Sequence, residues 1–321
     1  MPDVTSSACG ENRVAPPRRG GQAAHMDPRI YQILALAGLL IYGVGWLDFE
    51  IGPVQAAVTL AGVLLMQWLC SRLWKLERFE PKSALISGLS LCLLLRTNHL
   101  ALAAVGAVIT IAGKFVLRWR GKHLFNPTNF GLVAMMLATN GAVWVSPGQW
   151  GNVAFFGFLM VCIGGLVVMR AARSDVTLAF LGFYLALMFG RSLYLGEPMT
   201  IPLHRLQSGA LLLFAFFMIS DPKTTPDSRA GRILFAALVA YGAWYVQFRL
   251  FRTNGLLWSL AGLSLAVPVI DWLLPGRRYV WKGTRLGGGN GIFLTELRNL
   301  TKLTELDLAK APADSLGTPS P

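Results

Sequence analysis

In Ser87-Gly-Leu-Ser-Leu-Cys-Leu-Leu-Leu-Arg96 and in Ser208-Gly-Ala-Leu-Leu-Leu-Phe-Ala-Phe-Phe-Met-Ile-Ser-Asp-Pro222, a Ser-Gly pair precedes a short apolar run. A helix needs about 20 apolar residues to cross the hydrocarbon core of a bilayer. Both runs are too short for that, so they predict helices that cross only half of a membrane. Half-spans at matching places in two halves of a chain point to a ligand site near the membrane midplane.

The composition of the chain is that of a membrane protein. Its 321 residues are 54% hydrophobic and only 14% charged, whereas a soluble domain carries about 25% charged residues. We expect an all-α polytopic membrane protein with about ten transmembrane helices, two of them half-spans. The expected segments are 30–47, 54–70, 84–95 (short), 99–117, 129–145, 153–169, 176–195, 208–219 (short), 230–248 and 254–274.

The positive charge is concentrated in alternate loops. Lys and Arg favour the cytoplasmic side of membrane proteins, and here they place both termini in the cytoplasm of a bacterial cell, with the chain in the inner (plasma) membrane. The loop holding Arg249 and Arg252 is the exception. The net charge of +13 is thereby explained without nucleic acid, which we do not expect as a partner.

An internal repeat organises the membrane domain, residues 29–282. Ser-Gly heads a half-span, a full segment follows, and Asn129 in one half or Asn254 in the other opens the next segment. Five segments in each copy, about 29–145 and 153–274, require two repeats inverted across the membrane. Outside them, residues 1–28 predict a disordered cytoplasmic tail, and residues 283–321 a second tail with a short amphipathic helix over 292–308.

Three motifs carry the candidate binding residues for a small ligand at the repeat interface. The helix expected to start near Pro127 would expose N–H groups that can bind an anion. The small residues at 208–210 leave room for a flat ring, and Asp221 ends the second half-span. Each also has an ordinary explanation as an N-cap, as close packing or as an Asx turn before proline. The candidates are Asn126, Pro127, Thr128, Asn129, Ser208, Gly209, Ala210, Asp221 and Pro222.

Other chemistry finds little support in the sequence. We expect no catalytic residue in this chain and no metal site, because the cysteines lack Cys-x-x-Cys spacing. The histidines are predicted in loops or tails. Lys114 and Asp271 lie near segment ends, where side chains can reach the membrane surface, and Asp271 is expected to pair there with Arg277 or Arg278.

The motifs resemble a known family. His123-Leu-Phe-Asn-Pro-Thr-Asn-Phe-Gly131, Ser208-Gly-Ala-Leu-Leu-Leu-Phe-Ala-Phe-Phe-Met218 and Ser220-Asp-Pro-Lys-Thr-Thr-Pro-Asp-Ser-Arg-Ala-Gly231 are similar to motifs of NqrB, a membrane component of the sodium-translocating NADH:quinone reductase, and of RnfD, a membrane component of the Rnf complex. The resemblance covers about residues 30–282. It implies ten helices in two inverted repeats, flavin in the membrane, other membrane redox subunits as partners, and electron transfer coupled to ion movement.

One residue departs from the family pattern. Electron-transferring members read Ser-Gly-Ala-Thr, and the threonine carries FMN through a phosphoester bond, but Leu211 stands at that position here. Leucine has no oxygen, so the resemblance implies non-covalent flavin (FMN or riboflavin) instead of covalent FMN. The chain is similar in this respect to solitary family members, some from enediyne antibiotic gene clusters.

Three functions therefore stay open from the sequence. The first is a membrane electron-transfer subunit with non-covalent flavin and coupled ion transport, which would not be an enzyme on its own. The second is a transporter or channel-like protein that kept the fold and lost the redox centre. The third is a scaffold for a biosynthetic complex.

Overall fold

The computed structural model describes residues 27–46, 49–76, 79–145, 164–165, 169, 173–206 and 208–279. The first group of helices is α1 (Pro28–Trp46), α2 (Pro53–Leu73), α3 (Pro81–Leu94), α4 (Leu100–Val116) and α5 (Pro127–Ala138). The second is α7 (Ser174–Leu195), α8 (Thr200–Leu206), α9 (Gly209–Leu213), the π-helical η1 (Phe214–Met218), α10 (Arg229–Phe248), α11 (Gly255–Ser264) and α12 (Val267–Leu273).

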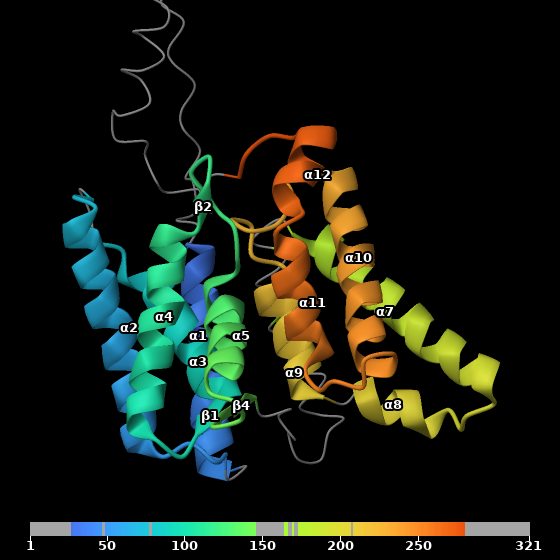
Figure 1. Ribbon diagram of the computed structural model, residues 1–321, viewed down its shortest axis with the longest axis horizontal. Helices are drawn as coiled ribbons and strands as arrows, with labels where there is room; N and C mark the ends of the chain where they lie inside the picture. Colours follow the sequence, from blue (N-terminus) through green and yellow to red (C-terminus); the bar gives the residue numbers. More distant parts are fainter. Residues whose placement is uncertain are drawn as a thin grey trace, which may run out of the picture.

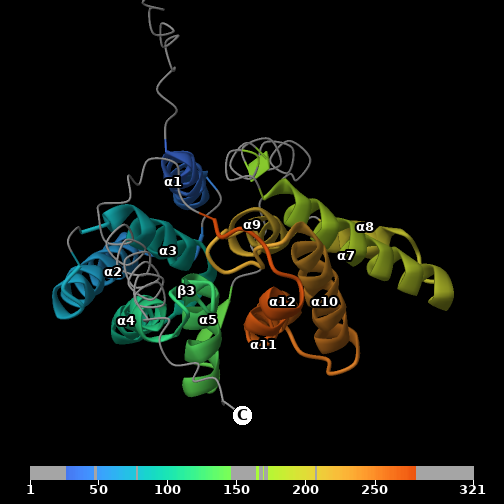
Figure 2. The same cartoon turned by 90° about the horizontal axis from the view of Figure 1, so that it is seen from above.

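The two groups stand side by side (Figure 1). In that view α2, α4, α5, α10 and α11 run roughly parallel or antiparallel, and α7 runs obliquely to them. In the first group α4 packs between α2 and α5, and α3 packs on α1 and α2. In the second group α10 packs between α7 and α11. The view from above places α5, α9 and α11 where the groups face each other (Figure 2), and α5 contacts α11 directly.

Two short antiparallel strand pairs tie loops together at opposite ends of the first group (Figure 1). One joins β1 (Leu95–Thr97) to β4 (Val143–Val145), and the other joins β2 (Arg118–Trp119) to β3 (Lys122–His123). The second pair, the β2–β3 hairpin, brings Lys122 within 3.0 Å of Asp227 and 2.7 Å of Asp271. Asp271 therefore pairs with Lys122 across the two groups, not with the expected arginines.

The chain is a mostly helical membrane protein. Within the described residues, three helices are long and apolar enough to cross a bilayer: Arg29–Trp46, Pro53–Leu73 and Ser174–Leu195. Two bent pairs bring the number to five if each is one span, namely Thr200–Leu206 with Gly209–Met218 at 55° and Gly255–Ser264 with Val267–Leu273 at 53°. The predicted count of ten is not reached by this criterion, and the predicted segment 153–169 lies largely outside the described residues, as do both predicted tails.

Short apolar helices lie at both predicted half-spans, with one correction. α9 begins at Gly209, as the Ser208-Gly209 pair predicted, and continues into η1 at Phe214. In the first half, however, Ser87-Gly88 lies in the middle of α3, which begins at Pro81. Gly88 is needed there for packing, because a Cβ at this position would lie 2.7 Å from Cγ2 of Val63 in α2.

The predicted full-length segment 129–145 is wrong. α5 ends at Ala138, and the chain then turns through Asn140 (φ 45°) and Gly141 (φ 98°). Left-handed backbone of this kind ends a helix. The apolar residues that follow belong to β4, whose register pairs Val145 with Leu95. Apolar content alone could not separate a helix end from a short buried strand.

Arg96 closes the end of α3. Its side chain is 2% exposed, and its guanidinium donates to the carbonyl oxygens of Cys92, Leu93 and Leu95 at 2.9–3.2 Å. The last carbonyls of a helix have no partner within the helix, so Arg96 satisfies groups that would otherwise be unpaired in an apolar surrounding. The ring of Phe49 lies 5.6 Å from the guanidinium carbon.

The contact at Gly88 makes a stability prediction. We expect Gly88→Val to lower the free energy of unfolding by about 1–3 kcal/mol, the usual range for overpacking a tight helix contact. The matched control is Gly38→Val in α1, where a Cβ would meet nothing within 4 Å. Thermal unfolding in detergent measures both, and equal melting temperatures for the two variants would contradict the close α2–α3 packing.

Candidate functional site

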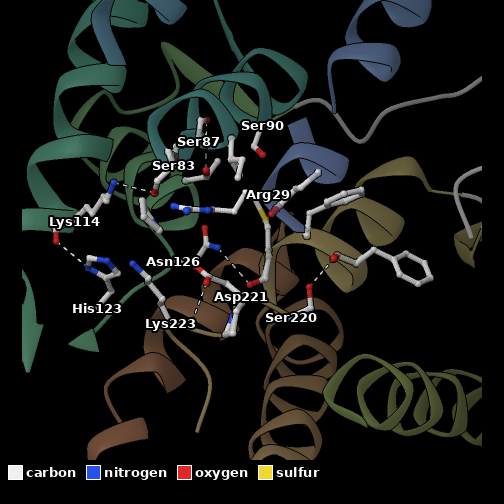
Figure 3. A pocket seen from close by; sticks show the side chains of 18 residues that line it. Arg29, Ser83, Ser87, Ser90, Lys114, His123, Asn126, Ser220, Asp221 and Lys223 are labelled. Carbon is white, nitrogen blue, oxygen red and sulfur yellow. Dashed lines mark hydrogen bonds between the residues drawn. The ribbon is translucent and has the colours of Figure 1, made fainter. Parts of the chain in front are cut away.

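A polar cavity of about 70 Å³ lies where the two groups of helices meet (Figure 3). Its wall is formed by residues of α1, α3, α4, β3, the start of α5, and η1 with the loop after it. A single buried water needs about 10–15 Å³ of such space, so the cavity as it stands has room for a few waters or a small anion.

The start of α5 forms one wall and connects the two groups. Pro127 occupies the first helical turn, and the Asn126 side chain caps the helix by accepting from the N–H of Asn129 at 3.1 Å. The same side chain donates through Nδ2 to the carbonyl of Met218 at 3.4 Å. Asn126 therefore holds the start of α5 against the end of η1, the second half-span.

The loop after η1 forms the opposite wall. Ser220 donates to the carbonyl of Phe216 at 2.5 Å, and the carboxylate of Asp221 accepts from the N–H of Lys223 at 3.0 Å. The latter contact is the Asx turn that a residue before proline favours. Burial raises the pKa of Asp221 above its ordinary value, while the N–H and the charge of Lys223 act in the opposite direction.

Hydroxyl groups line the third side. Ser83, Ser87 and Ser90 recur along one face of α3 and all line the cavity. Thr128 contacts this face by donating to the carbonyl of Ser87 at 3.5 Å. These groups give the cavity both donors and acceptors within an otherwise apolar helix bundle.

Three basic side chains reach the cavity, against the single carboxyl of Asp221. Lys114 is 7% exposed, and its ammonium donates to Gln67 Oε1 and Ser83 Oγ, both at 2.9 Å. It does not extend to the membrane surface as its position near a helix end predicted. Arg29 is paired with Asp27 at 2.9 Å and with Glu80 at 2.8 Å. The third, Lys223, has no acidic partner within 4.0 Å among the described residues, so the cavity favours an anion.

His123 lies at the edge of the cavity, in the β2–β3 hairpin. Its side chain is buried, and Nδ1 lies 3.0 Å from the carbonyl oxygen of Lys114. Burial, reinforced by the charges of Lys223, Arg118 and Lys114, lowers the pKa of His123 to about 3. The imidazole is therefore neutral at physiological pH, and Nδ1 carries the proton that it donates to Lys114.

The structure divides the residues predicted for the site. Five of them line the cavity, namely Asn126, Pro127, Thr128, Asp221 and Pro222. Four do not: Asn129, Ser208, Gly209 and Ala210.

The reasons for this division lie in the helices. Asn129 is fully buried and turned toward α11, where its Nδ2 donates to the carbonyl of Leu257 at 3.2 Å. The Ser208-Gly209-Ala210 motif lies at the start of α9. Within this half-span and the loop after it, only Phe216 and later residues line the cavity. Both ends of the second half-span thus cannot belong to one cavity of this size.

Several lining residues were missed from the sequence. The serines of α3 have a signal that could have found them, since positions 83, 87 and 90 share one helical face. Lys114 and Arg29 carry no comparable signal, because a basic residue at a segment end is usually solvated. Of the aromatic residues in η1, Phe216 and Phe217 line the cavity, while Phe214 packs on Phe180 at 5.1 Å between ring centroids.

Comparison with known proteins bears on the second half of the chain. Residues 146–279 match a protein family described as NQR2, RnfD, RnfE. This part of the chain is similar to that family. The recognition made from the motifs is thereby confirmed for these residues, which include Ser208-Gly209-Ala210 and Asp221-Pro222.

Relatives named as the D component of an ion-translocating oxidoreductase complex agree with this assignment. The protein of Pectobacterium carotovorum (strain PC1) is 33% identical over 136 residues, which are 41% of this chain and 36% of the relative. Those of Vibrio vulnificus (strain YJ016) and Escherichia coli (strain K12) are 29% and 32% identical over 133 and 142 residues. The matches cover 41% and 43% of this chain and 36% and 37% of these relatives. The chain thus spans about a third of the length of the NQR2, RnfD, RnfE relatives it matches.

The buried neutral His123 makes a pH prediction. Unfolded histidine has a pKa near 6.5 and the folded pKa is about 3, so the unfolded state binds more protons between these values. The free energy of unfolding then decreases as the pH falls below 6.5, by roughly 1.4 kcal/mol per pH unit. We expect His123→Asn, which keeps a donor near Nδ1, to lose this part of the pH dependence.

Melting curves between pH 7.5 and pH 5 for the original protein and His123→Asn measure the difference. A control substitution of the exposed His204 to Asn should leave the slope unchanged. Parallel pH profiles for the original protein and His123→Asn would show that His123 is not buried in its neutral form.

Proposed function

We propose that this protein is a membrane subunit of an ion-translocating oxidoreductase assembly and binds a flavin non-covalently in the cavity between its two groups of helices. The observation that carries the proposal is the meeting of Asn126, Thr128 and Asp221 with Lys114 and Lys223 around one cavity. The relatives are named as part of an ion-translocating oxidoreductase complex, which is the basis for proposing a redox function. Other membrane redox subunits would then be its partners.

The donor set suits a flavin. The polar edge of a flavin ring carries acceptors and one N–H donor, which the Asn126 amide and the α3 hydroxyls can satisfy. The basic side chains suit a phosphate, which favours FMN over riboflavin. The enclosed 70 Å³ is smaller than a three-ring system, so binding requires long flexible side chains at the wall, such as Met218 and Lys223, to change rotamer. Rotamer changes of this kind are common on binding.

The chain's own residues would bind and orient the flavin. Phe216 and Phe217 line the cavity and offer ring faces for stacking, while Asn126 fixes the wall by its contact with Met218. A bound flavin supplies electron-transfer chemistry that the side chains lack.

Covalent attachment at the second half-span is not part of this proposal. Leu211 occupies the position of the family's threonine, is 3% exposed and packs in the hydrophobic core. It offers no oxygen for a phosphoester bond. The proposed flavin site lies at the other end of the same half-span, so loss of the threonine leaves it intact.

We also propose the inverted arrangement of two five-helix repeats. The packing of α4 between α2 and α5 has its counterpart in α10 between α7 and α11, which supports two related copies. Their directions support the inversion: α4 ends at the β2–β3 hairpin, whereas the residues just before α10 contact that hairpin through Lys122 and Asp227. On this proposal the hairpin and both termini face the cytoplasm, where Lys and Arg gather.

A cavity-filling substitution tests the function. We expect Ser90→Leu to reduce FMN affinity at least tenfold, because Ser90 lines the cavity and is 6% exposed. The matched control is Ala210→Leu, which adds the same bulk at the other end of the second half-span. Quenching of flavin fluorescence during titration of detergent-purified protein measures the FMN affinity of both variants.

The two variants separate the candidate sites. Loss of FMN binding in Ala210→Leu with normal binding in Ser90→Leu would place the flavin at the start of α9 and contradict the proposal. Absence of FMN and riboflavin binding by the folded original protein would instead support a transporter or scaffold that has lost the redox centre.

Restoring the family threonine makes a second prediction. We expect Leu211→Thr, expressed in a host that attaches FMN to its own family members, to carry covalent flavin on a fraction of the molecules. Flavin fluorescence in a denaturing gel measures it, and Leu211→Val is the control without a hydroxyl. Covalent flavin on the unaltered protein would contradict the attachment argument.

A further inference from the structure

A second, larger groove lies outside the central cavity, between α7 and α10. Its volume is about 480 Å³, within the 300–1,000 Å³ that is usual for ligand pockets. Leu187, Arg191 and Leu195 line it from one face of α7 at four-residue spacing, and Trp244 and Phe248 line it from α10. In Figure 1 these parts of α7 and α10 lie toward the end opposite to the β2–β3 hairpin.

The groove is apolar along its length and basic at its mouth. Arg191 and Arg249 are both lining residues, Arg205 lies in α8, and Arg252 lies in the loop between α10 and α11. Arg191 is paired with Glu197 at 2.6 Å and lies over the Phe248 ring at 4.2 Å. Arg249 is exposed and has no acidic partner within 4.0 Å among the described residues.

The charge at this end is unusual for its place in the protein. On the orientation proposed above, on which this step rests, this side faces away from the cytoplasm, where few basic residues are expected. Four arginines gather there with one nearby acid, Glu197. An anionic group from outside the chain would balance them.

The aromatic residues of the groove suit the same surroundings. Trp244 and Tyr194 both line it. Tryptophan and tyrosine are enriched at the depth of the lipid headgroups, which fits a headgroup beside this end of α7 and α10.

We infer that this groove binds one anionic phospholipid, with an acyl chain along α7 and α10 and its phosphate at Arg191 and Arg249. The lining stretch of α7 from Ala186 to Leu195 is about 13 Å long at 1.5 Å per residue, enough for part of one chain. The inference does not depend on flavin binding, because the groove shares no lining residue with the central cavity.

Two glycines of α7 allow a matched test. A Cβ at Gly190, inside the groove, or at Gly182, outside it, would meet nothing within 4 Å. Gly190→Leu therefore adds a side chain inside the groove with no clash at its Cβ, and Gly182→Leu adds the same bulk elsewhere on the helix. Arg249→Gln removes only the exposed charge and leaves the groove open. It therefore tests the inference even if the glycine variants are poorly folded.

Native mass spectrometry of the full chain, from micelles with equal phosphatidylglycerol and phosphatidylcholine, measures the retained lipid. We expect retention of phosphatidylglycerol in the original protein and in Gly182→Leu, and its loss in Gly190→Leu. Arg249→Gln should reduce the preference about fivefold, the effect of one basic residue near an anionic headgroup. Equal retention of both lipids, unchanged retention in Gly190→Leu, or a neutral quinone in place of the lipid would overturn the inference.

Discussion

Helix ends leave carbonyl groups with no partner inside the helix, and in an apolar surrounding this constraint shapes both halves of the protein. In the first half, Arg96 donates to three carbonyls at the end of α3. In the second half, Asn126 reaches across from the start of α5 to the carbonyl of Met218. The end of α3 is therefore completed by a side chain just beyond it, and the end of η1 by a side chain from the other group of helices.

The central cavity follows from that second contact. Because Asn126 must approach the end of η1, the loop after η1 comes to face the serines of α3 and the ammonium of Lys114. Hydroxyls and basic groups line this space. A phosphate-bearing ligand would pair with both kinds of group, which is why the flavin proposal rests on this cavity and not on the attachment motif of the family.

The sequence could predict the parts of this arrangement that depend on local chemistry. Apolar run length predicted the short α3 and the α9–η1 pair, and the Asn-Pro and Asp-Pro motifs predicted two walls of the cavity. Each of these inferences needs only the residues within a few positions of the motif.

Tertiary contacts decided the rest. The sequence predicted a helix start at Gly88, but the glycine lies in the middle of α3, where the close approach of Val63 leaves no room for a Cβ. Residues 129–145 read as one span, but pairing with β1 turns their last part into a strand. Lys114 read as a surface lysine, but Gln67 and Ser83, far away in sequence, hold it inside. None of these partners is visible from the local pattern of a single sequence.

The flavin content of the protein as purified tests the account most directly. Absorbance and fluorescence spectra are recorded in detergent before denaturation, and again on the soluble and precipitated fractions after acid precipitation. The account predicts a yellow protein that releases its flavin into the soluble fraction, consistent with binding in the central cavity without a covalent bond. A colourless, well-folded protein that also fails to take up added FMN, or flavin that stays with the precipitated chain, would contradict it.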